Sequence, residues 1–427
     1  MATKQTPADA IVGFLGFSGA PNDFALSIER FTSRQWERAQ VWLDDAGLAF
    51  YFLQRLKDSN SAAIIPPGVL SRLERNFASN QERVAAMSGR LNEINKSFDS
   101  AGVRYEVVKG FSLTPEFCPQ SSLRYQADLD YLVACESLPG AHSVLIKAGY
   151  ESRVSRSGKE SIFITPGAKL SRGDAQYSLQ AGHAVELHIE IWDGQMHGTR
   201  PIPNLFSVSQ AKMHHCNGIS FPAQTDEDAF LLQVLHACRH VFSKWIRISH
   251  FLEIAYFLNR RGSDTGLWDN IEARVGENVT VREFVVIVAE LASRLFAVPL
   301  PSLIQRWRAR MRRQSQVWIE HYGRNWALCE LPAYQFNLFP PSRLVLFLQH
   351  QYQNAPGNGR RGKNDPAPRS QLSRTVSALK LNPSLLLSRE WRKHHLILRR
   401  SIFLVLSRIR YICEIPRWRW RTRSSAC

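Results

Sequence analysis

The stretch AVELHIEI, residues 184–191, alternates between apolar and polar side chains from Val185 onward. Because successive side chains on a β-strand point to opposite faces, the four apolar residues share one face, and Glu186, His188 and Glu190 share the other. This pattern predicts a strand with one face packed on a core and a polar opposite face. The chain must therefore contain a sheet in its middle part.

Residues 128–133, DLDYLV, predict a second strand because bulky apolar residues follow the two aspartates. Asp128 and Asp130 are two positions apart, so their carboxylates point to the same face and repel each other. Two further short apolar runs, RYEVVKG at 104–110 and SIFIT at 161–165, are also predicted strands. These strands, mixed with helices, indicate an α/β unit of about 120 residues.

Helical periodicity surrounds this unit. Apolar residues from Leu70 to Phe98 recur mainly at spacings of three and four, which predicts one long helix that ends near Gly102. Further helices are predicted over 23–58, 137–149, 226–260 and 278–296. We divide the chain into an N-terminal helical region at 1–101, an α/β core at 102–224, a helical domain at 225–354, and a basic linker and Arg/Trp-rich tail at 355–427.

The basic character of the chain belongs to its C-terminal part. The formal net charge is +17. Residues 1–300 carry 30 Lys and Arg against 32 Asp and Glu, a net of −2, whereas residues 301–427 carry 24 against 5, a net of +19. In the tail, Trp418 and Trp420 alternate with arginines. Such a segment binds an anionic membrane surface, binds nucleic acid, or is a packed helix with a solvated end.

Three features bear on the compartment. The first residues contain one lysine and a short, glycine-broken apolar run, which makes a poor signal peptide. No run of about 18 uncharged apolar residues occurs, so no membrane-spanning helix is expected. The seven cysteines include no CxxC pair, which favours free thiols in a reducing environment. We expect a cytoplasmic protein, with peripheral membrane contact through the tail as an alternative.

The paired aspartates make chemical sense if a cation lies between them, although a DxD pair alone is a weak signal. Mg²⁺ takes oxygen ligands and is usually held by a few carboxylates together with substrate phosphates. Glu186 can supply a third carboxylate, and three acids can hold two metals for an in-line phosphoryl displacement. Glu190 lies on the same predicted face as Glu186, so the choice of third carboxylate stays open.

Four sequence blocks occur in order within about residues 65–265. They are VVKGFSL at 107–113, RYQADLDYLV at 124–133, VELHIEIW at 185–192 and LHACRHVFSKWIRISHFLEIAYFL at 235–258. Together they resemble the uncharacterised bacterial nucleotidyltransferase family, a branch of the DNA-polymerase-β-like superfamily. The resemblance implies an α+β fold, with a polymerase-β-like nucleotidyltransferase core of mixed sheet and helices flanked by N- and C-terminal helical regions.

The resemblance also implies which residues form the catalytic and metal-binding site. Asp128 and Asp130 would be the metal-binding pair, and Glu186 the third carboxylate. Glu186 would also help to deprotonate or orient the incoming hydroxyl. Glu186 stands where Asp is common in the superfamily, which is a mild departure because the carboxylate is kept.

The resemblance implies that a second group of residues contacts the nucleotide. Lys109 and Gly110 stand where the superfamily has a Gly-Ser turn near the phosphates, and Ser112 follows two residues later. Arg124 would contact a phosphate, which suits a guanidinium, and His188 would line the site. As alternatives, Lys109 is a solvated lysine at a strand end, and Arg124 merely pairs with Asp128 or Asp130 and neutralises them.

Two histidines face the same side of a predicted helix, because His236 and His240 are four residues apart. The motif HACRH lacks the glutamate of HExxH, so a zinc protease is not indicated. Helix packing or hydrogen bonding is the expected role, and the resemblance allows a position near the nucleotide. Glu253 is interpreted as structural.

The predicted function is a Mg²⁺-dependent transfer of a nucleoside monophosphate from a nucleoside triphosphate, with ATP as first choice, to a hydroxyl acceptor with release of pyrophosphate. A small molecule, sugar, peptide or protein stays open as acceptor, and a nucleic acid is disfavoured because the catalytic body is nearly neutral. A non-catalytic nucleotide-binding module, or a basic membrane or nucleic-acid adaptor, is the alternative.

Overall fold

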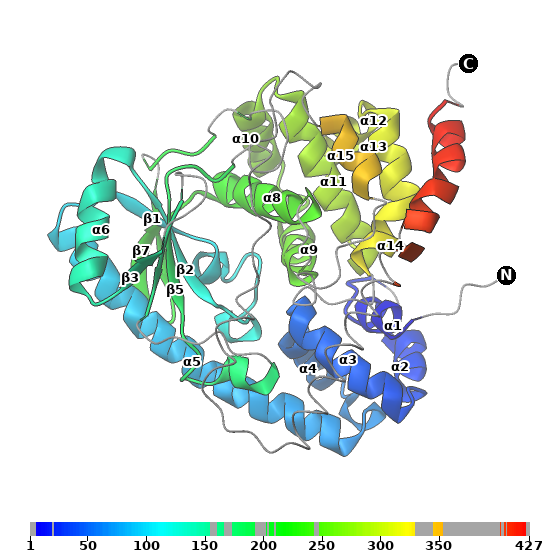
Figure 1. Cartoon of the computed structure of the whole chain (residues 1–427), viewed down its shortest axis with the longest axis horizontal. Coiled ribbons are helices and arrows are strands. Elements are labelled where there is room, and N and C mark those ends of the chain that lie inside the picture. The colour runs from blue at the N-terminus through cyan, green and yellow to red at the C-terminus, as the bar shows by residue number, and fades with distance from the viewer. Residues whose placement is uncertain are drawn as a thin grey trace.

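The computed structural model describes residues 6–18, 21–153, 160–165, 173–192, 202, 205–208, 211–242, 247–328, 345–352 and most of 402–423. Within these residues a seven-stranded mixed sheet lies beside a large group of helices (Figure 1). The fold is therefore α+β, as the sequence predicts.

The sheet places two strands with acidic residues next to each other. Its strands are β1 (Tyr105–Val108), β2 (Asp128–Val133), β3 (Glu151–Arg153), β4 (Glu160–Ile164), β5 (Ala184–His188), β6 (Lys212–Cys216) and β7 (Ile219–Ala223). Their order is β3-β4-β5-β2-β1-β7-β6. The β2–β5 and β1–β7 pairs are parallel, and the other neighbouring pairs are antiparallel. The central strand, β2, thus has β1 on one side and β5 on the other.

One face of the sheet is covered by helices α5 (Pro67–Ser100) and α6 (Leu138–Lys147). Leu129 and Tyr131 of β2 belong to the buried cluster on this face, together with the second half of α5. Burying a large apolar side chain stabilises a fold by about 1.5–3 kcal/mol. Because side chains alternate along β2, fixing this apolar face turns Asp130 to the opposite face.

The opposite side of the molecule is helical. The remaining helices are α1 (Pro7–Phe14), α2 (Pro21–Glu29), α3 (Ser33–Ala46), α4 (Ala49–Asp58), α8 (Asp226–Phe242), α9 (Ser249–Arg261), α10 (Thr265–Val275), α11 (Val279–Phe296), α12 (Ser302–Ala309), α13 (Arg313–Trp318), α14 (Arg324–Ala327) and α15 (Leu346–Tyr352). One hydrophobic core joins the N-terminal helices to α8–α11. The backbone N–H of Phe17 donates to the carbonyl of Phe296 at 2.8 Å, and Arg324 pairs with Asp9 at 2.9 Å.

Some of the predicted ends of helices and strands agree with the structure, and others differ. The long helix ends at Ser100, with Gly102 in the left-handed region at φ 66°. The strand predicted over 184–191 ends at His188, so Glu190 lies beyond it. Strands β3, β6 and β7 were not predicted. They are short, and β3 has three exposed residues, so no apolar alternation marks it.

The linker predicted at 355–371 lies outside the described residues. Of the tail, residues 408–423 form a helix that returns to the body, because Trp418 stacks on Phe347 with ring centroids 4.7 Å apart. Trp418 is buried, whereas Trp420 is exposed. Within the described parts of the chain, no helix has the length and apolar character needed to cross a membrane.

Candidate active site

The site begins at a tight turn at the end of β1. Lys109 and Gly110 both have positive φ values, 56° and 46°, which reverse the chain into the short turn Gly110–Leu113. The Ser112 hydroxyl donates to the Lys109 carbonyl at 2.8 Å and so closes the turn. Positive φ is costly for a residue other than glycine, so the surroundings must hold Lys109 in place.

Lys109 is held by Asp130. Its ammonium donates to Asp130 Oδ1 at 2.6 Å, and Lys109 is only 7% exposed. The alternative of a solvated lysine is therefore wrong. His188 Nε2 lies 2.9 Å from the same Oδ1, and because a carboxylate only accepts, the ring proton is on Nε2. Asp130 is thus the meeting point of two donors.

The carboxylates come together through strand register. In the parallel β2–β5 pair, Asp130 lies opposite Glu186 and Asp128 opposite Ala184. The ligand atoms of Asp130, Glu186 and His188 all lie within 4.8 Å of one another. Glu186 is therefore the strand glutamate that joins this group.

The three carboxyl groups of this cluster have different pKa shifts. Burial raises the pKa of Asp128, and the neighbouring Asp130 raises it further. Burial also raises the pKa of Glu186 well above its ordinary value, with repulsion from Asp128 and Asp130 next in importance. Burial alone would raise the pKa of Asp130, but the charge of Lys109 and the His188 hydrogen bond outweigh it and hold that pKa low. A cation beside Asp128 and Glu186 would relieve the repulsion.

The pKa values of Lys109 and His188, the two groups that donate to Asp130, are also shifted by burial and by the neighbouring charges. Burial acts to lower the pKa of the Lys109 ammonium, but the charges of Asp130, Glu186 and Asp128 outweigh it, so that pKa is raised. Burial and the Lys109 charge lower the pKa of His188. Lys109 is therefore charged and His188 neutral at neutral pH.

Arg124 does not contact the aspartates directly. Its Nε donates to Glu253 Oε1 of α9 at 2.9 Å, and Gln233 of α8 donates to the other carboxylate oxygen at 3.3 Å. The alternative in which Arg124 pairs with the two aspartates is not what forms. Glu253 is structural in this sense, because it holds Arg124 in the buried region between the sheet and α9.

Helix α5 fixes the loops that lead into both acidic strands. Arg83 is 2% exposed and donates to the carbonyls of Gln126 and Gly182, which precede β2 and β5. Asn80 donates to the carbonyls of Ser122 and Arg124. These contacts fix the loops before β2 and β5 and so help to set the register between the two acidic strands.

Sequence reasoning missed three residues near the cluster. Glu160 of β4 lies opposite His188, with Oε1 3.5 Å from the ring Nδ1. The Arg247 guanidinium donates to the Tyr125 carbonyl at 3.2 Å, and its charge acts on Asp128. His250 lies in the first turn of α9 beside the two predicted histidines. Glu160 immediately precedes the strand predicted over 161–165, and Arg247 and His250 lie in the block at 235–258, but no pattern singled out any of the three.

The fold and the site define an α+β protein whose central sheet carries a buried cluster of carboxylates, able to hold a divalent cation. Residues 32–297, more than half of the chain, match a family model described as uncharacterised nucleotidyltransferase. The chain belongs to this family of uncharacterised nucleotidyltransferases, so the resemblance drawn from the four blocks is confirmed. A search of curated proteins found no match. Family membership supports nucleotidyl transfer as the general activity, with a nucleoside triphosphate and a divalent metal.

Proposed function

We propose that this protein transfers a nucleoside monophosphate from a nucleoside triphosphate, ATP first, to a hydroxyl acceptor, and that Asp128, Asp130 and Glu186 hold Mg²⁺ for the reaction. The core would be of the polymerase-β-like type. The observation that carries the proposal is the register of β2 and β5, which sets Asp130 beside Glu186 on the polar face of the sheet.

The donor set fits the metal. All three side chains offer carboxylate oxygens, the ligands that Mg²⁺ prefers. Burial and mutual repulsion raise the pKa values of Asp128 and Glu186, which means that their ionised forms lack a counter-charge inside the protein. A bound dication would supply that counter-charge. When bound, Mg²⁺ would stabilise the attacking and leaving oxygens of an in-line displacement.

The protein's own residues then have separate tasks. Lys109 carries a positive charge beside Asp130, and in this proposal it would also contact a phosphate oxygen. Glu186 would orient the acceptor hydroxyl or accept its proton, and burial shifts its pKa upward, in the direction that makes a carboxylate a stronger base. Neutral His188 donates to Asp130 and keeps that carboxylate oriented. Arg124, oriented by Glu253, is the residue proposed to face a phosphate.

A second role is favoured by one surface of the tail. Ile402, Val405, Leu406, Ile409 and Ile412 are all exposed, although isolated exposed apolar residues would be more usual. Their spacing places them along one side of a helix, and arginines at 408, 410, 417 and 419 flank them. This arrangement suits an anionic lipid surface. Co-sedimentation with phosphatidylserine vesicles, lost on removal of residues 402–427, tests it.

The nucleotide proposal is tested by calorimetry. Each nucleoside triphosphate is titrated into the protein with Mg²⁺ and then with excess chelator. We expect Mg²⁺-dependent binding of one nucleotide, lost in an Asp128→Asn/Asp130→Asn variant and kept in an Asp269→Asn variant. Asp269 is exposed on α10, and its variant controls for the removal of an aspartate carboxylate outside the cluster.

Pyrophosphate release then separates an enzyme from a binding module. A protein that binds nucleotide and metal but releases no pyrophosphate with any acceptor pool would be a nucleotide-binding module. A protein that binds no triphosphate at about 1 mM, the weak end of ordinary substrate affinities, would contradict the proposal altogether.

A further inference from the structure

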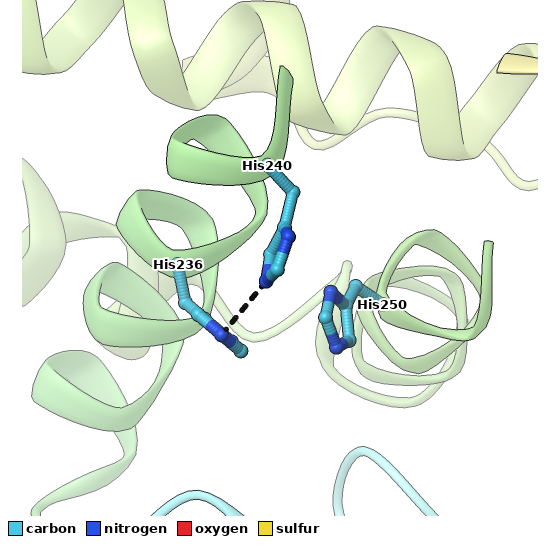
Figure 2. A group of neighbouring side chains, drawn as sticks. All are labelled: His236, His240 and His250. Atoms are coloured by element: carbon cyan, nitrogen blue, oxygen red, sulfur yellow. Dashed lines mark hydrogen bonds between the residues drawn. The ribbon is translucent and has the colours of Figure 1, made fainter. Parts of the chain in front are cut away.

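Three histidines converge between α8 and α9. His236 and His240 lie one turn apart on α8, and His250 lies in the first turn of α9. Figure 2 shows the three rings turned toward one another across the gap between the helices. The ring centroids are 4.7, 4.6 and 4.7 Å apart for the three pairs.

The nitrogens of the three rings lie close enough to share one ion. Nε2 of His236 and Nε2 of His240 are 3.1 Å apart, and one ligand atom from each of the three rings lies within 4.8 Å of the others. Two nitrogens on one tetrahedral Zn²⁺ are about 3.3 Å apart, given Zn–N bonds of about 2.0–2.1 Å. The α8 pair has nearly this separation, and because the three ligand atoms lie within 4.8 Å of one another, the third ring needs a shift of at most about 1.5 Å.

Hydrogen bonding within the protein leaves part of the cluster unsatisfied. Nδ1 of His236 and Nδ1 of His250 are buried and have no hydrogen-bond partner among the residues that the structure describes. His250 is 4% exposed. Buried polar atoms without partners are costly. Nδ1 of His250 is therefore available as a ligand atom, whereas Nδ1 of His236 would carry the ring proton when Nε2 of that ring binds the ion.

The protonation state suits a ligand role. Burial lowers the pKa of His236 well below its ordinary value, and the charge of Lys109 adds to this. Burial also lowers the pKa of His250, followed by the effect of His240. Both imidazoles are neutral at pH 7, and a neutral imidazole is the form that coordinates a metal.

We propose that His236, His240 and His250 form a binding site for one transition-metal dication of the Zn²⁺ type. Three nitrogen donors select such an ion over Mg²⁺, which takes oxygen ligands. Three protein ligands also leave a fourth position for water or an anionic oxygen.

This site is separate from the carboxylate cluster of Asp128, Asp130 and Glu186, whose donors are all oxygens. It shares no residue with that cluster. The inference goes beyond the proposed nucleotidyl transfer and does not rest on it, because its test reads metal binding and needs no substrate.

The test uses Co²⁺ as a spectroscopic probe in place of Zn²⁺. The full-length protein is stripped with chelator and titrated with Co²⁺ in the presence of 10 mM Mg²⁺, which occupies oxygen-ligand sites. We expect one equivalent to produce a visible absorption band, and one equivalent of Zn²⁺ to remove it. Wild-type protein with no such band, or with a band that Mg²⁺ suppresses, overturns the proposal without any variant being needed.

Variants then assign the ligands. His236→Gln and His250→Gln should each weaken Co²⁺ binding at least tenfold, while Asp130→Asn should leave it unchanged. The matched control is His142→Gln on α6, a histidine that contacts Ser161 and lies away from the cluster. Thermal unfolding with and without Zn²⁺ completes the test, since Zn²⁺ should raise the Tm of the wild type and of the control variant only. A band kept by both cluster variants contradicts the assignment.

Discussion

Arg124 and Glu253 form a buried ion pair, with Nε and Oε1 2.9 Å apart and Glu253 fully buried. The pair joins the segment before β2 to α9. It therefore links the strand that carries Asp128 and Asp130 to the helices on the opposite side of the molecule. The nearby charges raise the pKa of Arg124 even though burial opposes this, so the guanidinium stays charged.

Replacing one partner of this pair should be strongly destabilising. Arg124→Met leaves the Glu253 carboxylate buried without its counter-charge, and such changes cost about 3–5 kcal/mol. We expect a fall in Tm of several degrees, measured by circular dichroism. The double variant Arg124→Met/Glu253→Leu should recover a large part of the loss, because no charge is then left unpaired.

The control for that series is an exposed pair of the same kind. Arg306 and Glu272 are 3.0 Å apart, with side chains 52% and 41% exposed. Arg306→Met should cost no more than about 1 kcal/mol. Equal losses at the two arginines would show that burial is not what makes the Arg124 pair important.

A methyl group at Gly110 would meet the buried side chain of Gln126. Gly110 has φ 46°, and a Cβ built there would collide with the amide nitrogen of Gln126. Gly110→Ala should therefore cost the left-handed backbone penalty of about 1–2 kcal/mol and a steric term in addition. Gly102→Ala isolates the first contribution, because Gly102 has φ 66° and nothing within 4 Å of its Cβ position.

Stability and nucleotide binding are both measured on these two alanine variants. Gly110→Ala should lower the Tm more than Gly102→Ala and should weaken nucleotide binding, which Gly102→Ala leaves unchanged. Adding Gln126→Ala to Gly110→Ala should restore part of the stability. If Gly110→Ala and Gly102→Ala lower the Tm equally, the contact with Gln126 does not contribute to the loss of stability.

Glu106 makes the stability depend on pH. Burial raises its pKa to about 7, with a smaller contribution from Asp228. Because the folded-state pKa is above the unfolded value, the folded form holds the proton more tightly, and stability is lost as pH rises from about 4.5 to about 7. Glu106→Gln removes this loss, so its stability relative to wild type should be about 1–2 kcal/mol greater at pH 8 than at pH 4.5.

The measurement for Glu106 is chemical denaturation at pH 4.5, 6 and 8. Glu93→Gln is the control, since Glu93 lies on α5 with a side chain 65% exposed. Its stability should follow the wild-type pH curve. A Glu106→Gln variant with the same pH curve as wild type would mean that Glu106 ionises in the folded protein as it does in the unfolded chain.

Lys109 should set the pH range in which the carboxylate cluster can bind a cation. Its charge is the largest influence that lowers the Asp130 pKa against burial. In Lys109→Met that pKa rises, so Mg²⁺-dependent nucleotide binding should require a higher pH, with the midpoint shifted up by at least about one unit. Calorimetry between pH 5 and 8 checks this.

The control for Lys109 is Lys57→Met, because Lys57 pairs with Glu74 at the surface with both side chains 46% exposed. Its pH midpoint should equal that of the wild type. If the Lys109→Met protein binds nucleotide with an unchanged pH midpoint, the Lys109 charge does not control the ionisation of Asp130.

The sequence predicts those elements whose apolar pattern is long or regular. The stripe from Leu70 to Phe98 repeats over many turns, and α5 follows it from Pro67 to Ser100. The alternation around Val185 predicts β5 but overruns its end by three residues, since the pattern continues where the pairing stops. Strand β3 is exposed along its length, so its existence depends on pairing with β4 and not on its own composition.

The site is predictable only where partners lie on neighbouring strands. Alternation placed Asp128 and Asp130 on one face, and the register that sets Asp130 beside Glu186 agrees with that expectation. The partner of Arg124 is Glu253, 129 residues away along the chain. Such a contact depends on how α9 packs against the sheet, which no local pattern encodes. The assignment of catalytic roles to these residues stays a prediction.

The hydrogen bond from Phe17 to Phe296 closes the helical core across almost 280 residues of chain. During synthesis the apolar face of α1 is made first, but the helix α11 against which it packs is made last of the large core helices. Closing such a long loop is slow compared with forming local helices. The nascent chain must therefore keep an unpaired hydrophobic face for most of its translation, which makes the N-terminal helices the segment where we expect a chaperone to bind.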